Sequence, residues 1–430
     1  MSNDFYLSVG IDVGADFSFM SIALPNQTFV GKPLKITHSE LSSLENAVVA
    51  IKKAEESNSI RARIFLESTG VYQYPLFCYF REKGFTISIV NPIITKSSTN
   101  INIRKVHNDK SDSRKIALLG LKPDLKVSVI PSDLVLDLRN LTREYYNLVD
   151  CRSSYVNRLH RELRIAFPQY IGIFSKLTVK TSLALLEKYA MPAAFLAAKK
   201  NPVIKLISSS SRSGDAYAER KYQEIIVAAK DAITFGHALP TNGRLIKLYV
   251  SFIKKYDQEV DSILEAMHEL VDANQQETFV KQIRLIETIK GAGFLSAVTL
   301  VCEIGDFSVF RYPKQLFAYF GLDPAVKQSG KFNGTRVKMS KRGSPLARRA
   351  VHTIALVSIA RSKNGDANNQ VLRDYYTLKC LSKPNMVALG AVMHKVCNII
   401  FAILRDEKPF TIITPAQHKL NHLQKSCVAA

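Results

Sequence analysis

The first 125 residues alternate between short apolar segments with strand patterns and amphipathic segments with helix patterns. This order restricts the fold more than any other feature of the chain. Strands are expected at Tyr6–Asp12, Phe17–Leu24, Phe29–Ile36, Ala62–Leu66 and Thr86–Val90. Helices are expected at Leu41–Glu56, Tyr74–Lys83 and Lys110–Leu119, the first with Ser39 as its N-cap. Three strands followed by alternating helices and strands predict an α/β domain with an antiparallel start and parallel additions.

Acidic residues stand where several of these elements begin or end, and the order of elements is that of the ribonuclease-H-like (RuvC-like) fold. Asp12 ends the first strand within GIDVG, and Glu67 follows the fourth strand within LESTG. Asp109 and Asp112 share one face at the start of the last helix. Each pattern alone has a plainer explanation, as a turn residue or a favourable acidic first turn. Together, four carboxylates in one fold repel each other and predict a site for two Mg²⁺ (or Mn²⁺) ions.

Two long segments in the middle of the chain carry apolar residues at near-heptad spacing. The first segment contains Leu138, Leu141, Tyr145, Leu148, Tyr155 and Leu159, with Arg152 interrupting the stripe. The second contains Leu245, Leu248, Phe252, Tyr256, Val260, Ile263, Met267 and Leu270. They predict a helical-hairpin or coiled-coil arm, whose stripes serve internal packing or, alternatively, contact between copies. Residues 171–242 read as a helical subdomain inserted into this arm.

Positive charge is concentrated in the last third of the chain. The formal net charge is +22, from 59 Lys and Arg against 37 Asp and Glu, and residues 281–430 hold 23 basic and 8 acidic residues, a net +15. This excess predicts a polyanionic partner, with nucleic acid favoured over an anionic membrane. One segment without acids carries eight candidate phosphate contacts: Lys327, Lys331, Arg336, Lys338, Lys341, Arg342, Arg348 and Arg349.

Two further motifs of the last third concern phosphate chemistry. Ser329 lies within the basic segment, where nearby cations would stabilise an alkoxide and a pentacovalent phosphorus, although a Ser-Gly pair is usually only a turn. The IKGAG turn resembles a helix-hairpin-helix, in which backbone N–H groups near Gly291 and Gly293 would meet a phosphate. A plain turn between helices explains the same pattern.

Cellular location follows from what the sequence lacks. Six cysteines form no CxxC motif, the N-terminus has no signal-peptide pattern, and no apolar run approaches about 20 residues. We therefore expect a cytoplasmic protein that is not embedded in a membrane.

Motifs at both ends of the chain resemble the DEDD-type serine transposases of the insertion-sequence 110 family, the bridge-RNA-guided recombinases. The N-terminal motifs are GIDVG, LESTGVY, IVNP and NDKSDSRKIA, and the C-terminal motifs are IKGAGFLSAVTLVCEIGDFSVF, FAYFGLDPAVKQSGK and SKRGSPLARRA. The resemblance implies a RuvC-like domain over residues 1–125, a coiled-coil arm over 126–280 and a basic, mainly α-helical transposase domain over 281–430.

The resemblance also implies roles and partners. Asp12, Glu67, Asp109 and Asp112 match the metal-binding acids of the family, and Ser329 matches its nucleophile. The serine would attack double-stranded donor and target DNA and become covalently linked to an end. A guide (bridge) RNA and a homotetramer are implied as well, acting on DNA of the bacterial nucleoid. Five positions depart from the family pattern: His107 and Asn108 before the helix acids, Ser113, Lys290 and Ala347.

Other functions fit parts of the sequence. A site-specific DNA invertase of the same family shares both domains. A RuvC-like junction nuclease would use water, and Ser329 would then be dispensable. An actin-like ATPase needs a second phosphate-binding glycine loop, for which the IKGAG turn is a poor substitute. A non-catalytic nucleic-acid-binding protein explains the charge but leaves the four carboxylates unexplained.

Overall fold

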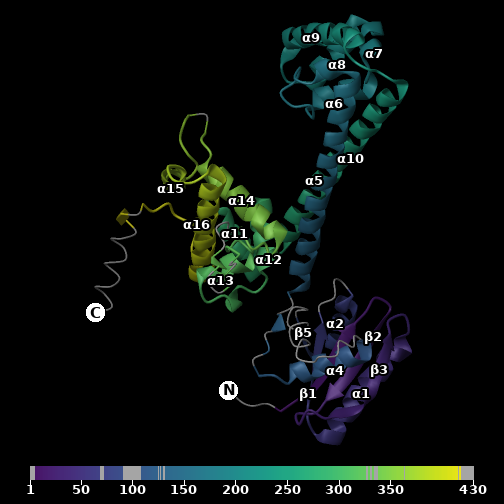
Figure 1. The fold of residues 1–430 in the computed structure, drawn as a ribbon, viewed down its shortest axis with the longest axis vertical. Coiled ribbons are helices and arrows are strands. Elements are labelled where there is room, and N and C mark those ends of the chain that lie inside the picture. The colour runs from purple at the N-terminus through teal and green to yellow at the C-terminus, as the bar shows by residue number, and fades with distance from the viewer. Residues whose placement is uncertain are drawn as a thin grey trace. The chain divides into compact units, whose positions relative to one another are not determined.

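The computed structural model divides the chain into two compact units, Met1–Ser132 and Asp133–Ala430. It describes residues 5–67, 72–90, 108–123, 125, 127–128, 131–325, 328–329, 332–333, 338–362, 364–414 and 416–417. The first unit is a mixed α/β sheet domain and the second is mostly helical (Figure 1). The arm and the C-terminal helices fall within the second unit.

A sheet of six strands organises the first unit. The strands are β1 (Leu7–Val13), β2 (Phe17–Ala23), β3 (Phe29–Thr37), β4 (Ala62–Glu67), β5 (Thr86–Val90) and β6 (Val127–Ser128). Their order across the sheet is β3-β2-β1-β4-β5-β6. β1 to β3 pair antiparallel, whereas β4 and β5 add parallel to β1 and to each other. The antiparallel start and parallel additions agree with the expected arrangement, and β6 is a further short antiparallel strand.

Helices cover both faces of this sheet. They are α1 (Leu41–Asn58), α2 (Gln73–Glu82) and α4 (Asp109–Gly120). Ile11 of β1 packs in one core with α1 and α2, whereas Phe65 of β4 packs in another with α4. The predicted N-cap at Ser39 is wrong, because α1 begins after Glu40, which makes no side-chain cap. The chain turns at Ser39 before the helix starts.

Two antiparallel helices of equal length form the arm: α5 (Asp133–Ala166) and α10 (Pro240–Ala273). Tyr155 of α5 packs its ring against Phe252 and Tyr256 of α10, with ring centres 4.7 and 5.7 Å apart. Arg152, which interrupts the apolar stripe, pairs with Asp257 of α10. The stripes therefore pack at least partly within one chain.

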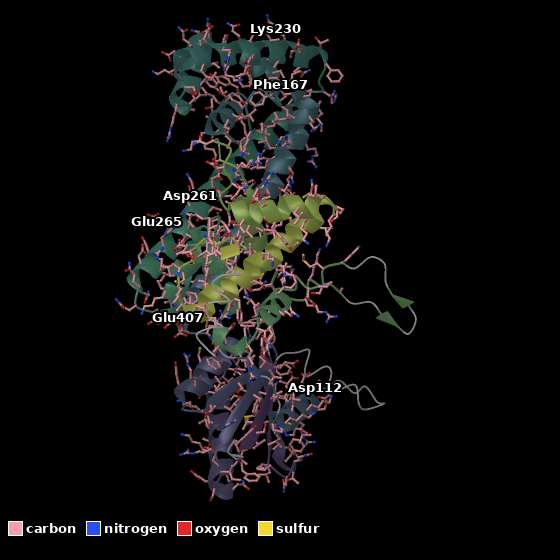
Figure 2. The ribbon with its side chains drawn as sticks, turned by 90° about the vertical axis from the view of Figure 1, so that its left-hand side faces the viewer. Asp112, Phe167, Lys230, Asp261, Glu265 and Glu407 are labelled. Carbon is pink, nitrogen blue, oxygen red and sulfur yellow. The ribbon has the colours of Figure 1, made fainter. Side chains whose placement is uncertain are left out.

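A helical tip continues the arm. It contains η1 (Pro168–Tyr170), α6 (Lys180–Lys188), α7 (Pro192–Ala197), α8 (Lys200–Ser210) and α9 (Gly214–Thr234). Figure 2 shows Phe167 among these helices, where it is fully buried, and Lys230 on their surface. The chain enters and leaves the tip at one place, since the His237 N–H donates to the Ile165 carbonyl at 2.9 Å.

The remaining helices and the end of the arm away from the tip form a hydrophobic core of their own. They are α11 (Thr278–Glu287), α12 (Phe294–Ile304), η2 (Phe307–Val309), α13 (Pro313–Tyr319), α14 (Pro345–Ile359), α15 (Gln370–Cys380) and α16 (Asn385–Asp406). Within the described ranges, α16 is long and apolar enough to cross a membrane, with a mean hydropathy of 2.0 over 18 residues, although His394 and Lys395 interrupt its apolar run. However, 56% of that window is buried, as in the core helix of a folded domain.

Candidate functional sites

The structure brings the four predicted acids to one edge of the first unit. Asp12 lies near the end of β1, and Glu67 is the last residue of β4. These strands are parallel neighbours, with Ile11 opposite Leu66, so their carboxyl ends coincide. Because strand side chains alternate, Asp12 and Glu67 belong to the face that α4 covers. Asp109 and Asp112 lie in the first turn of α4.

Gly10 determines how closely α4 approaches this face. A Cβ atom at Gly10 would lie 2.1 Å from the backbone nitrogen of Ala117 and 2.4 Å from the carbonyl oxygen of Ser113. Both are backbone atoms of α4, which cannot move aside as a flexible side chain would. At the other end of the helix, a Cβ at Gly120 would lie 2.2 Å from the Ser8 hydroxyl. Glycine on both elements thus lets α4 lie directly on β1.

Ser113 anchors the acidic end of α4 with a buried hydroxyl. Its hydroxyl donates to the Lys110 carbonyl at 3.0 Å, and the Ser21 hydroxyl of β2 lies 2.8 Å away. The Asn108 side chain caps the helix by accepting from the Lys110 N–H at 3.2 Å. Two departures from the family pattern, Asn108 and Ser113, therefore hold the segment that carries Asp109 and Asp112.

Burial and neighbouring carboxylates act together on Asp12. They raise the pKa of its carboxyl from 3.8 to about 7, through desolvation first and then through the negative charges of Glu67, Asp112 and Asp109. The positive charge of Lys115 opposes this shift. The Lys115 ammonium itself pairs with Asp112 at 2.6 Å. The pKa of Asp12 therefore responds to all the other charged groups of the site.

The oxygen-rich donor set has the chemistry that Mg²⁺ and Mn²⁺ prefer. A bound cation would also relieve the repulsion between Asp12 and the neighbouring carboxylates, which raises the pKa of Asp12. As placed, no three His, Cys, Asp or Glu side chains in the described part of the chain form a group that could hold an ion. The metal role of Asp12, Glu67, Asp109 and Asp112 thus stays a prediction.

Ser329 lies on a β-hairpin rather than in an open loop. It belongs to β7 (Gln328–Ser329), which pairs antiparallel with β8 (Phe332–Asn333), Ser329 standing opposite Phe332. Nearer the base, the Ala325 N–H donates to the Lys338 carbonyl at 2.8 Å. The structure describes the backbone of Ser329, and the role of its hydroxyl stays a prediction.

The base of this hairpin is held by a close backbone contact. A Cβ at Gly343 would lie 1.8 Å from the Tyr319 carbonyl oxygen, and one at Gly321 would lie 2.5 Å from the Gly343 nitrogen. The Arg348 guanidinium spans the same place, donating to the Phe320 carbonyl at 3.0 Å and to the Gly343 carbonyl at 2.7 Å. Arg348 therefore ties the two ends of the hairpin to α14.

The eight predicted phosphate contacts have different surroundings. Lys327, Lys331 and Arg336 lie outside the described residues. Lys338, Lys341 and Arg342 are exposed and form no ion pair in the described part of the chain. Arg348 and Arg349 are engaged within the protein, since Arg349 pairs with Asp150 at 2.9 Å and lies over the Tyr146 ring. The exposed trio is the better candidate for phosphate contact.

The IKGAG turn joins α11 to α12 as expected. Gly291 has φ +115° and approaches Ser358 so closely that a Cβ would lie 2.6 Å from the Ser358 hydroxyl. That hydroxyl donates to the Lys290 carbonyl at 2.7 Å. Gly291 therefore serves packing against α14, whereas Gly293 is the N-cap of α12 and has open space around it. Phosphate binding at this turn stays a prediction.

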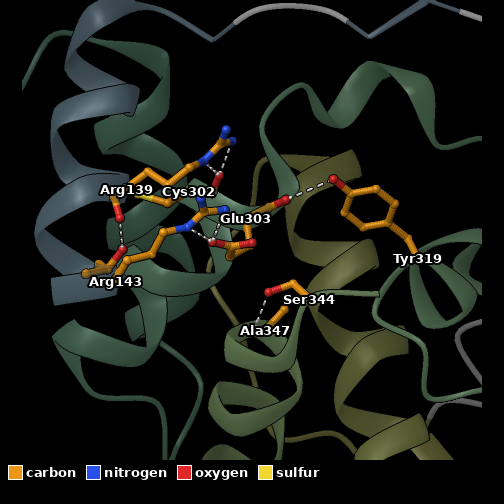
Figure 3. Close-up of polar contacts among 8 residues, drawn as sticks. Arg139, Arg143, Cys302, Glu303, Tyr319, Ser344 and Ala347 are labelled. Atoms are coloured by element: carbon orange, nitrogen blue, oxygen red, sulfur yellow. Dashed lines mark hydrogen bonds and ion pairs between the residues drawn. The ribbon is translucent and has the colours of Figure 1, made fainter. Parts of the chain in front are cut away.

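Polar contacts that the sequence patterns did not predict join the arm to the hairpin base (Figure 3). Arg139 of α5 donates from Nε to the Cys302 carbonyl at 2.9 Å, and Arg143 pairs with the buried Glu303 at 3.2 Å. From the other side, the Tyr319 hydroxyl donates to the Glu303 carbonyl at 3.1 Å. The partners are 16 to 163 residues apart, so no local motif signals them.

Comparison with known proteins finds similarity at both ends of the chain. Residues 9–168 match a family described as Transposase, of the DEDD IS110 type, and residues 283–377 match the Transposase IS116/IS110/IS902 family. An uncharacterized 44.8 kDa protein of insertion element IS116 from Streptomyces clavuligerus is 26% identical over 314 residues, which are 71% of this chain and 73% of that protein. The transposase for insertion sequence element IS1111A from Coxiella burnetii is 24% identical over 196 residues, covering 45% of this chain and 50% of that protein.

Proposed function

Since the chain carries two domains of the IS110 transposase family, we propose that it is a DNA transposase of an insertion sequence, which cleaves and rejoins DNA. The observation that carries the proposal is that the carboxyl ends of β1 and β4 bring Asp12 and Glu67 to the sheet face covered by α4, whose first turn holds Asp109 and Asp112. The strand order β3-β2-β1-β4-β5 supports a ribonuclease-H-like assignment of the first unit. In that reading, the acids stand where the carboxyl ends of β1 and β4 meet α4.

Asp12, Glu67, Asp109 and Asp112 would hold Mg²⁺ or Mn²⁺. A bound divalent ion supplies charge neutralisation and polarises a phosphoryl oxygen. The residues of this chain supply the rest of the site. Gly10 and Ser113 place α4 against the sheet, and burial keeps Asp12 in an environment where a charged form is costly without a cation.

Ser329 would be the nucleophile. Its Oγ would attack the phosphorus of a DNA phosphodiester, forming an Oγ–P bond while one sugar oxygen leaves as a hydroxyl. The proton lost by the serine passes to a base, and the leaving oxygen gains one. Because a phosphodiester is replaced by a phosphodiester, reversal onto a new strand needs no ATP.

The exposed cations of the hairpin base support DNA as the partner. Lys338, Lys341 and Arg342 are available for phosphate oxygens, and residues 281–430 have a net charge of +15, from 23 basic and 8 acidic residues. Double-stranded donor and target DNA would bind there. A guide RNA, a homotetramer and action at the bacterial nucleoid are proposed from the family resemblance.

A covalent-adduct assay tests this function. Wild-type protein incubated with Mg²⁺ and a nicked DNA substrate should carry DNA through a denaturing gel, and EDTA, Asp12→Asn and Ser329→Ala should each remove the adduct. Asp16→Asn and Ser382→Ala are matched controls, because both residues are exposed and lie in the same two units. Ser340 is a poor control, since its hydroxyl donates to Asp323 at the hairpin base.

Three results separate the alternatives. An adduct that survives Ser329→Ala would assign the nucleophile elsewhere. Free DNA ends without any adduct would support the water-using junction nuclease. An adduct with strand exchange only between inverted sites would favour the invertase.

A further inference from the structure

Lys115 occupies an unusual place beside the acids. Its ammonium lies 2.6 Å from Oδ1 of Asp112, one turn earlier on α4. The two side chains are 35% and 27% exposed, so the pair is partly withdrawn from water. Oδ1 of Asp112 is also within 3.4 Å of the Ser111 hydroxyl.

The other cations of α4 are directed elsewhere. The Lys110 ammonium lies 5.7 Å from the centre of the Phe19 ring, and the Arg114 guanidinium lies 5.0 Å from that of Phe29. Among the ion pairs of the described residues, Lys115 is the cation of this helix that contacts an acid, and its charge also opposes the effect of the three carboxylates that raise the pKa of Asp12.

An ammonium and a divalent ion need the same carboxylate lone pairs. At 2.6 Å the Lys115 ammonium occupies one approach to Oδ1 of Asp112, and its positive charge weakens the attraction of this carboxylate for a second cation. We propose that Lys115 is a tethered counter-ion of the acidic cluster, which stabilises the acids and competes with a divalent ion for Asp112. The competition part rests on the proposed metal role of these acids, whereas the stabilising part does not.

The proposal makes Lys115 a positioning residue with two opposite effects. Removing its charge leaves the acids with uncompensated repulsion, which lowers stability when no metal is bound. The same change frees Asp112 and strengthens the attraction for a divalent ion. An ordinary surface pair on a helix would contribute little stability and would leave metal affinity unchanged.

Lys115→Met tests both effects in the full-length protein. Mn²⁺ binding, followed by the paramagnetic resonance of the free ion, should tighten about five- to tenfold relative to wild type. Melting in EDTA at pH 8 should fall by about 2 °C. Lys110→Met is the matched control, since it removes a cation of the same helix that does not contact the acids. Asp12→Asn should weaken Mn²⁺ binding in either background.

The outcomes are distinguishable. Unchanged or weaker Mn²⁺ binding by Lys115→Met, with Asp12→Asn still weakening it, would overturn the competition while leaving the proposed function intact. If neither wild type nor Lys115→Met binds Mn²⁺, the metal role of the acids fails, and the EDTA melt alone decides whether Lys115 stabilises the cluster. An EDTA melt equal to that of Lys110→Met would overturn the counter-ion role.

Discussion

The two units concentrate charge in opposite ways. In the first, acids of two strands and of a helix gather where the helix lies directly on the sheet, so burial and like charge raise the pKa of Asp12 to about 7. In the second, Lys338, Lys341 and Arg342 are exposed at the base of a hairpin. Acids packed this way can all be ionised at once only when a cation offsets their repulsion. Exposed cations, in contrast, can contact a polyanion without rearrangement of the protein. This difference agrees with the proposed roles of ion binding in the first unit and phosphate binding in the second.

Gly10→Ala should have the largest effect, because it disrupts the packing of α4 on β1 at the acidic site of the first unit. The added Cβ would overlap backbone atoms of α4, so the helix must move away from β1. We expect a loss of about 3 kcal/mol in the free energy of unfolding and a return of the Asp12 pKa toward its usual value. Chemical denaturation measures the first effect. Gly390→Ala, with nothing within 4 Å of the new Cβ, is the control, and equal stability of both variants would refute the packing argument.

Arg348→Ala should remove the clamp at the hairpin base. Two carbonyl groups, of Phe320 and Gly343, lose a charged donor, for which we expect a cost of about 2 kcal/mol. Hydrogen exchange should speed up at the Ala325 and Ser340 amides, which pair across the hairpin. Arg348→Lys should restore part of the protection. The salt dependence of DNA binding should not change, and a flatter dependence would show that Arg348 contacts phosphate after all.

Asp12→Asn should stabilise the protein at high pH in EDTA. Since the folded pKa lies above the unfolded one, the folded state holds the proton more tightly, and stability falls as pH rises from about 4 to about 7. Asparagine removes this deficit, with an expected gain of about 1–2 kcal/mol at pH 8, after allowing for solvent screening of a partly exposed group, and less at pH 5. Thermal melts at both pH values measure the difference. Asp16→Asn, at an exposed position of the same unit, is the control.

Lys338→Ala, Lys341→Ala and Arg342→Ala should each have a small effect. Each lost phosphate contact should lower the slope of log affinity against log salt by about 0.9 for duplex DNA. Filter binding at several salt concentrations measures that slope. If the triple variant keeps the wild-type slope, these residues form only a solvated surface, and the contrast between the two units weakens.

Local patterns were sufficient for much of the first unit. Short apolar segments with strand patterns located β1 to β5, and the spacing of Asp109 and Asp112 indicated a shared helix face. The strands β6, β7 and β8 escaped prediction because two residues are too few for a period. The engagement of Arg349 with Asp150 was equally invisible, since 199 residues separate them. The sequence could not reveal which basic residues form ion pairs or hydrogen bonds within the folded protein.

The hydrogen bond between His237 and Ile165 closes the neck through which the chain enters and leaves the tip. A segment whose two ends meet at one point behaves as a cassette: it can be exchanged, enlarged or excised while the register of α5 against α10 is preserved. Length variation among related chains should therefore accumulate between these two residues. The same neck offers protein engineers a place to splice in a foreign binding module, with a short glycine-rich join from Ala166 to Pro240 as the empty version of the cassette.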